Sequence, residues 1–115
     1  MTSYEASIAK YAHNVFGALK VTFFNAISRL CDEDQYEHCE MPGGIPSYEN
    51  VRAGVLASGY INEEHTKVPG PDSHYGFGGK CFIKDLKAME KEYRYTPLGR
   101  LIAPIEALNE EFRGR

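Results

Sequence analysis

The sequence predicts an all-α domain organised around one long N-terminal helix. Between about Ser3 and Cys31, apolar residues recur at three- and four-residue steps, no proline occurs, and Gly17 is the only strong helix breaker. Two further segments, near residues 47–58 and 85–112, also carry helical spacing. No set of alternating segments would build a strand-rich parallel sheet. The expected fold is therefore a long first helix, shorter helices and a glycine-rich loop in a dimerising helical domain.

Composition limits the classes of function. The chain has 115 residues, which suits a single domain over 1–115. It carries 13 basic and 16 acidic residues, a net charge of −3, so no basic surface points to nucleic acid. No apolar run approaches the roughly 20 residues of a membrane span. The start, Met-Thr-Ser-Tyr-Glu, has neither the basic nor the apolar region of a signal peptide, so none is expected.

The cysteines indicate a reducing compartment. Cys31, Cys39 and Cys81 are an odd number without a C-x-x-C pair, which argues against a disulfide framework and a structural zinc site. We therefore expect reduced thiols in a cytoplasmic protein and no metal. Cys31 lies on the apolar helical pattern and is expected to pack. Cys39 stands beside His38, which leaves open a metal site completed by distant partners.

The first helix is expected to begin at Ser3, as its N-cap, with Glu5 in its first turn. Such a helix would be roughly 40 Å long at 1.5 Å per residue, which is long for a domain of this size. Tyr11, Val21 and Phe24 add apolar surface beside the main stripe. Two apolar faces favour packing against a second subunit, so we expect a homodimer through this helix. The main stripe consists of Ile8, Ala12, Val15, Phe16, Leu19, Phe23, Ile27 and Leu30.

The middle of the chain alternates loops with one helix. Residues 32–46 are polar, end in Met-Pro-Gly-Gly-Ile-Pro and predict a loop. Ser47 is expected to cap a helix that runs to about Ser58 and ends at Gly59. A second loop follows over residues 62–75, with a turn at Pro-Gly-Pro-Asp. The inward side chains of the helix are expected to be Val51, Val55 and Leu56.

Two helices are expected near the C-terminus. The first spans about Asp85 to Tyr93, with Leu86, Met89 and Tyr93 inward. Thr96 is the expected N-cap of the last helix, with Pro97 at its first position and a kink at Pro104. The inward residues of this helix are expected to be Leu98, Leu101, Ile102, Ile105, Leu108 and Phe112.

The most distinctive stretch is Gly-Phe-Gly-Gly-Lys-Cys-Phe-Ile-Lys-Asp, residues 76–85. Its glycines allow close backbone approach and positive φ, Cys81 follows them in the position of a nucleophile, and Asp85 lies one helical turn beyond if a helix starts there. The stretch resembles the active-site motif G-F-G-G-x-C-x-x-K-D of the UDP-glucose/GDP-mannose dehydrogenase family. The resemblance implies that this is the central, dimerising domain of such an enzyme, which serves polysaccharide biosynthesis.

Lys10 and Asn14 share one face of the first helix. Without other evidence they are a solvated lysine and an indifferent asparagine. Their surroundings, however, resemble the helix that opens the family's middle domain, written E-A-x-x-x-K-x-x-x-N, in which the lysine and asparagine face the reacting carbon. The segment from Thr96 to Glu110 similarly resembles the helix that leaves this domain.

The loop Val-Pro-Gly-Pro-Asp, residues 68–72, resembles one branch of the family, in which it lies along the sugar nucleotide. It favours the UDP-glucose branch. The resemblance implies substrate binding by Tyr75, Gly76, Phe77, Gly78 and Gly79. His65 and His74 either contact phosphate or ribose or are plain loop histidines. Tyr60 stands where many members carry an arginine that reaches the neighbouring subunit's substrate; either this arginine is lost, or Arg52 or Lys67 replaces it.

The resemblance also implies a reaction: the C6 hydroxymethyl of UDP-glucose is oxidised twice, by two NAD molecules, to UDP-glucuronate. Cys81 would hold the aldehyde as a thiohemiacetal and then a thioester, which water hydrolyses. Lys10 and Asn14 would stabilise the oxyanion, and Asp85 would activate the water or move a proton. Lys84 would be a second cation near thiolate, phosphate or cofactor, unless it is only solvated.

The resemblance covers nearly all of this chain but only the middle third of the family's length. No G-x-G-x-x-G opens a βαβ unit here, so NAD is expected to be bound by domains absent from this chain. Catalysis by this chain alone is therefore not expected. Two alternatives stay open: an excised central domain of a sugar-nucleotide dehydrogenase, and a free-standing dimerisation module or partner subunit derived from that family.

Overall fold

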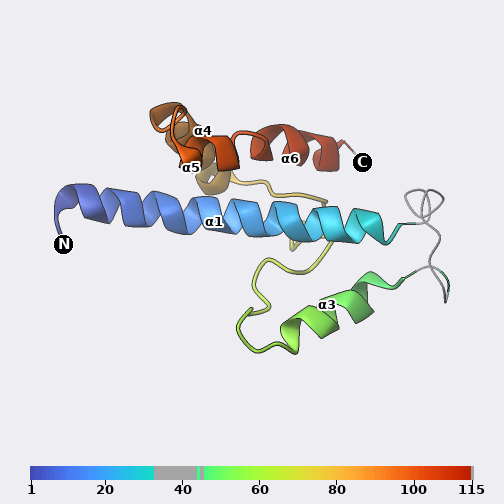
Figure 1. Cartoon of the computed structure of the whole chain (residues 1–115). Coiled ribbons are helices and arrows are strands. Elements are labelled where there is room, and N and C mark those ends of the chain that lie inside the picture. Colours follow the sequence, from blue (N-terminus) through green and yellow to red (C-terminus); the bar gives the residue numbers. More distant parts are fainter. Residues whose placement is uncertain (33–43, 45, 115) are drawn as a thin grey trace.

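The computed structural model describes residues 1–32, 44 and 46–114, and within them all regular secondary structure is helical. The elements are α1 (Ser3–Leu30), α3 (Tyr48–Leu56), α4 (Lys80–Glu92), α5 (Pro97–Ile102) and α6 (Ile105–Arg113). Helices α4, α5 and α6 lie along one side of α1, and α3 lies on the other (Figure 1). The predicted all-α class and long first helix are confirmed. Cys39, His38 and most of the predicted loop over residues 32–46 fall outside the described residues.

Helix α1 begins with a capping box. The Thr2 hydroxyl accepts the N–H of Glu5 at 3.1 Å, and the Glu5 carboxylate accepts the N–H of Thr2 at 2.7 Å. These hydrogen bonds lower the pKa of Glu5. The predicted N-cap, Ser3, was therefore wrong by one residue, because Glu5 stands three residues after Thr2 and closes the box there.

The buried face of α1 differs from the predicted stripe. Three residues of the predicted main stripe, Phe16, Phe23 and Leu30, are 63%, 57% and 54% exposed in the single chain. Small residues explain the difference: a Cβ on Gly17 would lie 2.5 Å from the ring of Phe82, so α4 packs on α1 where the side chains are smallest. Apolar spacing alone could not reveal which face carries the close contact. The buried residues of α1 are Val15, Gly17, Ala18, Val21, Thr22, Phe24 and Asn25.

Helices α1 and α4 run antiparallel. The hydroxyls of Tyr4 and Tyr93 lie 2.9 Å apart at one end of the pair, and the Asn14 amide meets Asp85 further along. Along the helix pair, residue numbers therefore rise in α1 while they fall in α4. The core between the helices is built mainly from Val15, Ala18, Val21, Leu86 and Met89, with Phe77, Ile102 and Ile105.

Helix α4 begins at Lys80, five residues earlier than predicted. Its N-cap is Gly79, whose φ of +83° belongs to the left-handed region that glycine adopts without strain. Leu86 and Met89 are buried as predicted, and Tyr93 is half-buried. The early start places Cys81 inside the first turn of α4 and not in the loop before it.

The predicted kinked last helix is two helices. Pro104 separates α5 from α6, as the missing N–H and the ring of proline require. Thr96 caps α5 as predicted, since its hydroxyl accepts the N–H of Gly99 at 3.2 Å. Ile102, Ile105 and Phe112 are buried, but Leu98, Leu101 and Leu108 were predicted inward and are 37%, 58% and 38% exposed.

Helix α3 is anchored through the loop that follows it. Ser47 caps it as predicted, at 3.4 Å from the Asn50 nitrogen, but the helix ends at Leu56, two residues before the predicted Ser58. Thr66 is fully buried; its hydroxyl accepts from Arg52 Nε at 2.8 Å, and its carbonyl accepts from the Tyr48 hydroxyl. Burial raises the pKa of Tyr48 to about 12. Val51, Val55 and Leu56 are half-buried.

Among the described residues, no helix is long and apolar enough to cross a membrane.

Candidate active site

The centre of the candidate site is a hydrogen bond between α1 and α4. Asn14 Nδ2 donates to Asp85 Oδ2 at 2.6 Å, and Asp85 is 3% exposed. The other side of the Asn14 amide, Oδ1, lies 3.0 Å from His13 Nδ1. The structure therefore brings together two of the predicted catalytic residues, and it fixes the orientation of the amide between them.

Lys10 and Cys81 lie on either side of this bond. Lys10 precedes Asn14 by four residues on α1, and Cys81 precedes Asp85 by four residues on α4. Four residues correspond to about 6 Å along a helix axis. Because α1 and α4 are antiparallel, the order along the seam is Lys10, then Asn14 with Asp85, then Cys81. Lys10 and Cys81 are exposed, so the two ends of the line are open to solvent. The Lys10 ammonium lies 6.0 Å from the centre of the Tyr11 ring.

Cys81 is a free thiol in the first turn of α4. The first N–H groups of a helix have no partner within the helix, and the helix dipole places positive potential there. An oxyanion formed on a group bound at Cys81 would lie in this favourable field. Lys84, one turn further on, is exposed and adds a cation to the same end of the helix.

The loop before Cys81 is held by buried amides. We call residues 76–79 the glycine loop. The N–H of Gly76 donates to Asn25 Oδ1 at 2.8 Å, and Phe77 is paired twice with Asn109. Arg113 Nε donates to the Phe77 carbonyl at 2.9 Å, while its Nη2 donates to Asp72 Oδ2 at 2.8 Å. Helices α1 and α6 thus both hold the start of the glycine loop, at Gly76 and Phe77.

The glycines are needed for this grip. A Cβ at Gly76 would lie 2.3 Å from Asn109 Oδ1, and one at Gly78 would overlap Arg113 Nη2. Gly76 also has a φ of +73°. The sequence suggested that these glycines let a ligand approach the backbone, but at Gly76 and Gly78 the space is taken by the protein's own side chains. A Cβ at Gly79 would meet no described atom within 4 Å.

Phe77 points inward. Its side chain is 5% exposed and belongs to the core, with its ring centre 6.0 Å from that of Phe82. In this chain the ring therefore packs into the core, and substrate binding by Phe77 stays a prediction, since Phe77 also borders the hollow beside the glycine loop. Tyr75, also predicted to bind substrate, is half-buried. The ring centre of His65 lies 5.3 Å from that of Phe82, so His65 also packs against the residue next to Cys81.

A hollow of about 330 Å³ borders the glycine loop. His65 and Lys67 supply its basic groups and Asp72 its acidic one, while the Arg113 hydrogen bond lowers the pKa of Asp72. Arg52, offered as a substitute for the family's arginine, is engaged by Thr66 and by Glu49, whose carboxylate lies 3.3 Å away. Lys67 is exposed, which leaves it as the freer of the two substitutes.

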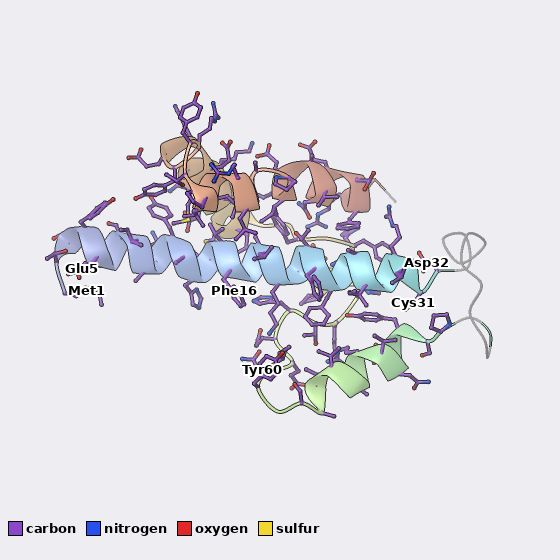
Figure 2. The ribbon with its side chains drawn as sticks, in the orientation of Figure 1. Met1, Glu5, Phe16, Cys31, Asp32 and Tyr60 are labelled. Carbon is purple, nitrogen blue, oxygen red and sulfur yellow. The ribbon has the colours of Figure 1, made fainter. Side chains whose placement is uncertain are left out.

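A second hollow, of about 470 Å³, lies on the opposite flank of α1. Phe16 and Phe23 of α1 and Tyr60 line it, and Tyr60 is 84% exposed. Figure 2 shows Phe16 and Tyr60 on the same side of α1 as α3. We call Phe16, Phe23 and Tyr60 the aromatic face. Tyr60, the residue predicted to stand in place of the family's arginine, thus presents an exposed ring here.

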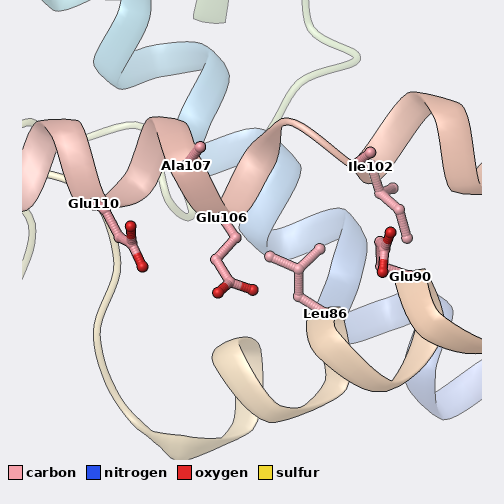
Figure 3. A pocket seen from close by; sticks show the side chains of 7 residues that line it. Leu86, Glu90, Ile102, Glu106, Ala107 and Glu110 are labelled. Carbon is pink, nitrogen blue, oxygen red and sulfur yellow. The ribbon is translucent and has the colours of Figure 1, made fainter.

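A third hollow, of about 300 Å³, lies between α4, α5 and α6 (Figure 3). Glu90, Glu106 and Glu110 give it an acidic rim over a floor that includes Leu86 and Ile102. Two of these carboxylates are already paired, Glu90 with Arg94 at 3.0 Å and Glu106 with Lys87 at 3.7 Å. This hollow contains no nucleophile and is not the candidate active site.

Asn25, Asn109 and Arg113 received no role from sequence reasoning. A signal was present in α6, where Asn109 stands on the same stripe as the buried Ile105 and Phe112. A polar amide on an apolar stripe must find a buried partner. Spacing alone could not tell that the partner is the backbone of the glycine loop. In the described part of the chain, His, Cys, Asp and Glu form no metal-binding group of three.

The sequence of this chain matches a known family. The family model for the central domain of UDP-glucose/GDP-mannose dehydrogenases matches residues 4–111. The chain belongs to the UDP-glucose/GDP-mannose dehydrogenase family. The match lies within the central domain, and it includes Lys10, Asn14, Cys81 and Asp85. The predicted resemblance is confirmed.

Individual relatives carry names of the same activity. A UDP-glucose 6-dehydrogenase of Rhizobium meliloti is 34% identical over 107 residues, covering 91% of this chain and 21% of the relative. A UDP-glucose 6-dehydrogenase of Rickettsia felis is 33% identical over 84 residues, covering 73% of this chain and 15% of the relative. The chain thus spans about a quarter or less of the length of the relatives it matches. No solved structure matches significantly.

Proposed function

We propose that this chain is the central, catalytic-cysteine domain of an NAD-dependent UDP-glucose 6-dehydrogenase. The observation that carries the proposal is the seam between α1 and α4, where the Asn14–Asp85 hydrogen bond stands between Lys10 and Cys81. A nucleophile, two donors for an oxyanion and a carboxylate for proton transfer are the groups that oxidation of an aldehyde to an acid requires. The names of the relatives support the substrate class.

NAD does not fit the described residues of this chain. Dinucleotide sites of this kind are built on a βαβ unit, and those residues form helices and loops only. NAD would supply hydride acceptance, and we assign its binding to domains outside this chain. Lys84 remains a candidate contact to it, because the side chain is exposed beside Cys81.

The chain's own residues would perform the covalent steps. The Cys81 thiolate adds to the C6 aldehyde of the nucleotide sugar, forming a C–S bond and an oxyanion that the Lys10 ammonium and the Asn14 amide stabilise. Conversion of this adduct to a thioester would need a hydride acceptor, which NAD held outside this chain would supply. Asp85 then takes a proton from water as the water attacks, the C–S bond breaks, and the carboxylate leaves with the thiol restored.

Asn14 has a geometric reason to serve this site. Its Nδ2 carries two hydrogens, and Asp85 accepts one of them. The second can turn toward the oxygen on the substrate carbon. The buried carboxylate therefore orients the amide in the free protein, before the oxyanion forms.

The proposal includes the partners and compartment expected from the sequence. Two copies of the chain would pair through α1 and the aromatic face. UDP-glucose would lie along the glycine loop near His65 and Lys67. The cytoplasmic location stays a prediction that rests on the cysteine count. The second candidate is a free-standing dimerisation module or partner subunit that has kept the fold; such a scaffold would need none of Lys10, Asn14, Cys81 and Asp85, so their presence together favours the first candidate.

The test starts with the gene. If its reading frame continues into nucleotide-binding domains, the complete polypeptide and its Cys81→Ser variant are assayed with UDP-glucose and NAD, and the carboxylate product is measured by chromatography. We expect the variant to stall at or before the acyl stage, with no carboxylate. Normal turnover by the variant would remove the nucleophile role. Stop codons on both sides would favour the second candidate.

A further inference from the structure

One buried side chain outside the catalytic seam is hydrogen-bonded to the backbone that leads to Cys81. Asn109 of α6 is 6% exposed. Its Oδ1 accepts the N–H of Phe77 at 2.7 Å, and its Nδ2 donates to the carbonyl of Phe77 at 2.9 Å. A single amide therefore pairs with both polar groups of one loop residue, as a neighbouring strand would. Buried backbone groups need such partners, and here the helix supplies them.

The path from this contact to the thiol is short. Only Gly78, Gly79 and Lys80 separate Phe77 from Cys81, and Gly79 is the N-cap of α4. The two glycines carry no side chains that could hold this backbone, so the hydrogen bonds to Phe77 fix it on one side, while packing of Phe82 and Leu86 against α1 fixes α4 on the other. Glycine is the most flexible residue, so contacts from outside this segment, such as the hydrogen bonds from α6 to Phe77, are needed to give it one conformation.

The side chains of Asn109 and Arg113 fit closely against the glycines on either side of Phe77. Gly76 and Gly78 lack the Cβ atoms that would collide with Asn109 and Arg113. The loop is therefore shaped around groups of α6, and Arg113 adds a second donor to the same Phe77 carbonyl at 2.9 Å.

We propose that Asn109 is a positioning residue for Cys81, acting by fixing Phe77 and thereby the first turn of α4. The importance of that thiol to catalysis rests on the proposed function, but its position and environment do not. The alternative is that Asn109 only stabilises the packing of α6.

The test measures the Cys81 thiol directly in the 115-residue chain. The rate of alkylation by iodoacetamide is followed for each cysteine by peptide mass spectrometry, in the wild type and in Asn109→Asp, with the guanidinium-unfolded chain as reference. The introduced carboxylate is nearly isosteric and still accepts the N–H of Phe77, but it cannot donate to the Phe77 carbonyl. In the variant we expect the alkylation rate of Cys81 to change at least about threefold, toward the rate of Cys81 in the unfolded chain. The alkylation rate of Cys31 should stay the same.

A pH series separates positioning from stability. Protonation of the introduced carboxyl restores a donor, so the ratio of variant to wild-type Cys81 rates should return toward one between about pH 7 and pH 5. Met89→Ala, which removes a 4% exposed side chain of α4 away from the loop, is the matched control for lost stability. It should leave the folded-state Cys81 rate unchanged.

A second variant keeps the test decisive if Asn109→Asp does not fold. Arg113→Lys removes the guanidinium Nε bond to Phe77 from a side chain that is 25% exposed, and it should shift the Cys81 rate in the same direction by a smaller factor. The proposal is overturned if folded variants react at the wild-type rate, if Met89→Ala shifts Cys81 equally, or if the wild-type rate already equals the unfolded one. None of these results depends on dehydrogenase activity, so failure here and failure of the proposed function can be told apart.

Discussion

The amide of Asn14 donates a 2.6 Å hydrogen bond to the carboxylate of Asp85, across the interface of α1 and α4. Asp85 is 3% exposed, so this donor replaces much of the water that a carboxylate would otherwise bind. The bond joins the two helices at the point where the candidate chemistry is placed. It therefore contributes both to the stability of the helix pair and to the geometry of the site.

Removal of this donor should be costly. In Asn14→Ala the carboxylate stays buried and loses its partner, so we expect the free energy of unfolding to fall by roughly 1–3 kcal/mol. Urea unfolding followed by circular dichroism measures it. The matched control is Asn50→Ala on the exposed side of α3, which makes the same change without a buried partner and should cost nothing. Equal effects at the two positions would show that the bond does not contribute to stability.

The sequence was sufficient for the class of fold, but not for the packing, and the catalytic roles that its motifs suggest stay predictions. Helical spacing, Thr96, Pro97 and Pro104 were local signals, and the structure places helix boundaries close to them. Which apolar face of α1 is buried within the chain could not be predicted, because it depends on the close approach of Phe82 to Gly17, which leaves Phe16 and Phe23 exposed. Spacing allowed Cys81 and Asp85 to share a face, but only the antiparallel pairing of α1 and α4 shows that Asn14 meets Asp85 and that Lys10 lies beyond it.

Two helical glycines should respond to alanine with opposite signs. A Cβ at Gly99 in α5 would lie 2.1 Å from the backbone oxygen of Tyr93, which cannot move without shifting the chain. We expect Gly99→Ala to lower the free energy of unfolding by about 1–3 kcal/mol. Gly54 in α3 has no described atom within 4 Å of its Cβ position, so Gly54→Ala should raise stability by up to about 1 kcal/mol through helix propensity. Urea unfolding of both variants measures the effects, and a stabilised Gly99→Ala would contradict the described packing.

Tyr48 should make the fold sensitive to alkali. Burial raises its pKa to about 12, above the ordinary value of 10.0, so the folded state favours the neutral phenol. This contribution is fully present below pH 10.0 and is lost as the pH rises toward about 12. Tyr48→Phe removes both the titration and the hydrogen bond to Thr66. The variant should be less stable at neutral pH, by roughly 1 kcal/mol, but should lose less stability between these pH values. Thermal unfolding of the wild type and the variant between pH 10.0 and about 12 measures this difference. Tyr95→Phe, at a 91% exposed site, is the control and should behave like the wild type.

The aromatic face should hold two copies together. Phe16 and Phe23 are 63% and 57% exposed and border a hollow of about 470 Å³, an arrangement that leaves apolar area in water in the single chain. Exposed aromatic clusters of this kind mark interfaces. We expect the wild type to dimerise in sedimentation equilibrium and Phe23→Ser to raise the dissociation constant by about tenfold or more, since a buried phenyl contributes about 1.5–3 kcal/mol. Leu101→Ser is the matched control: Leu101 is 58% exposed on α5, on the other side of α1, and its loss should leave the dimer intact. A wild type that stays monomeric at high concentration, or a Leu101→Ser variant that dissociates as readily as Phe23→Ser, would rule out pairing through this face.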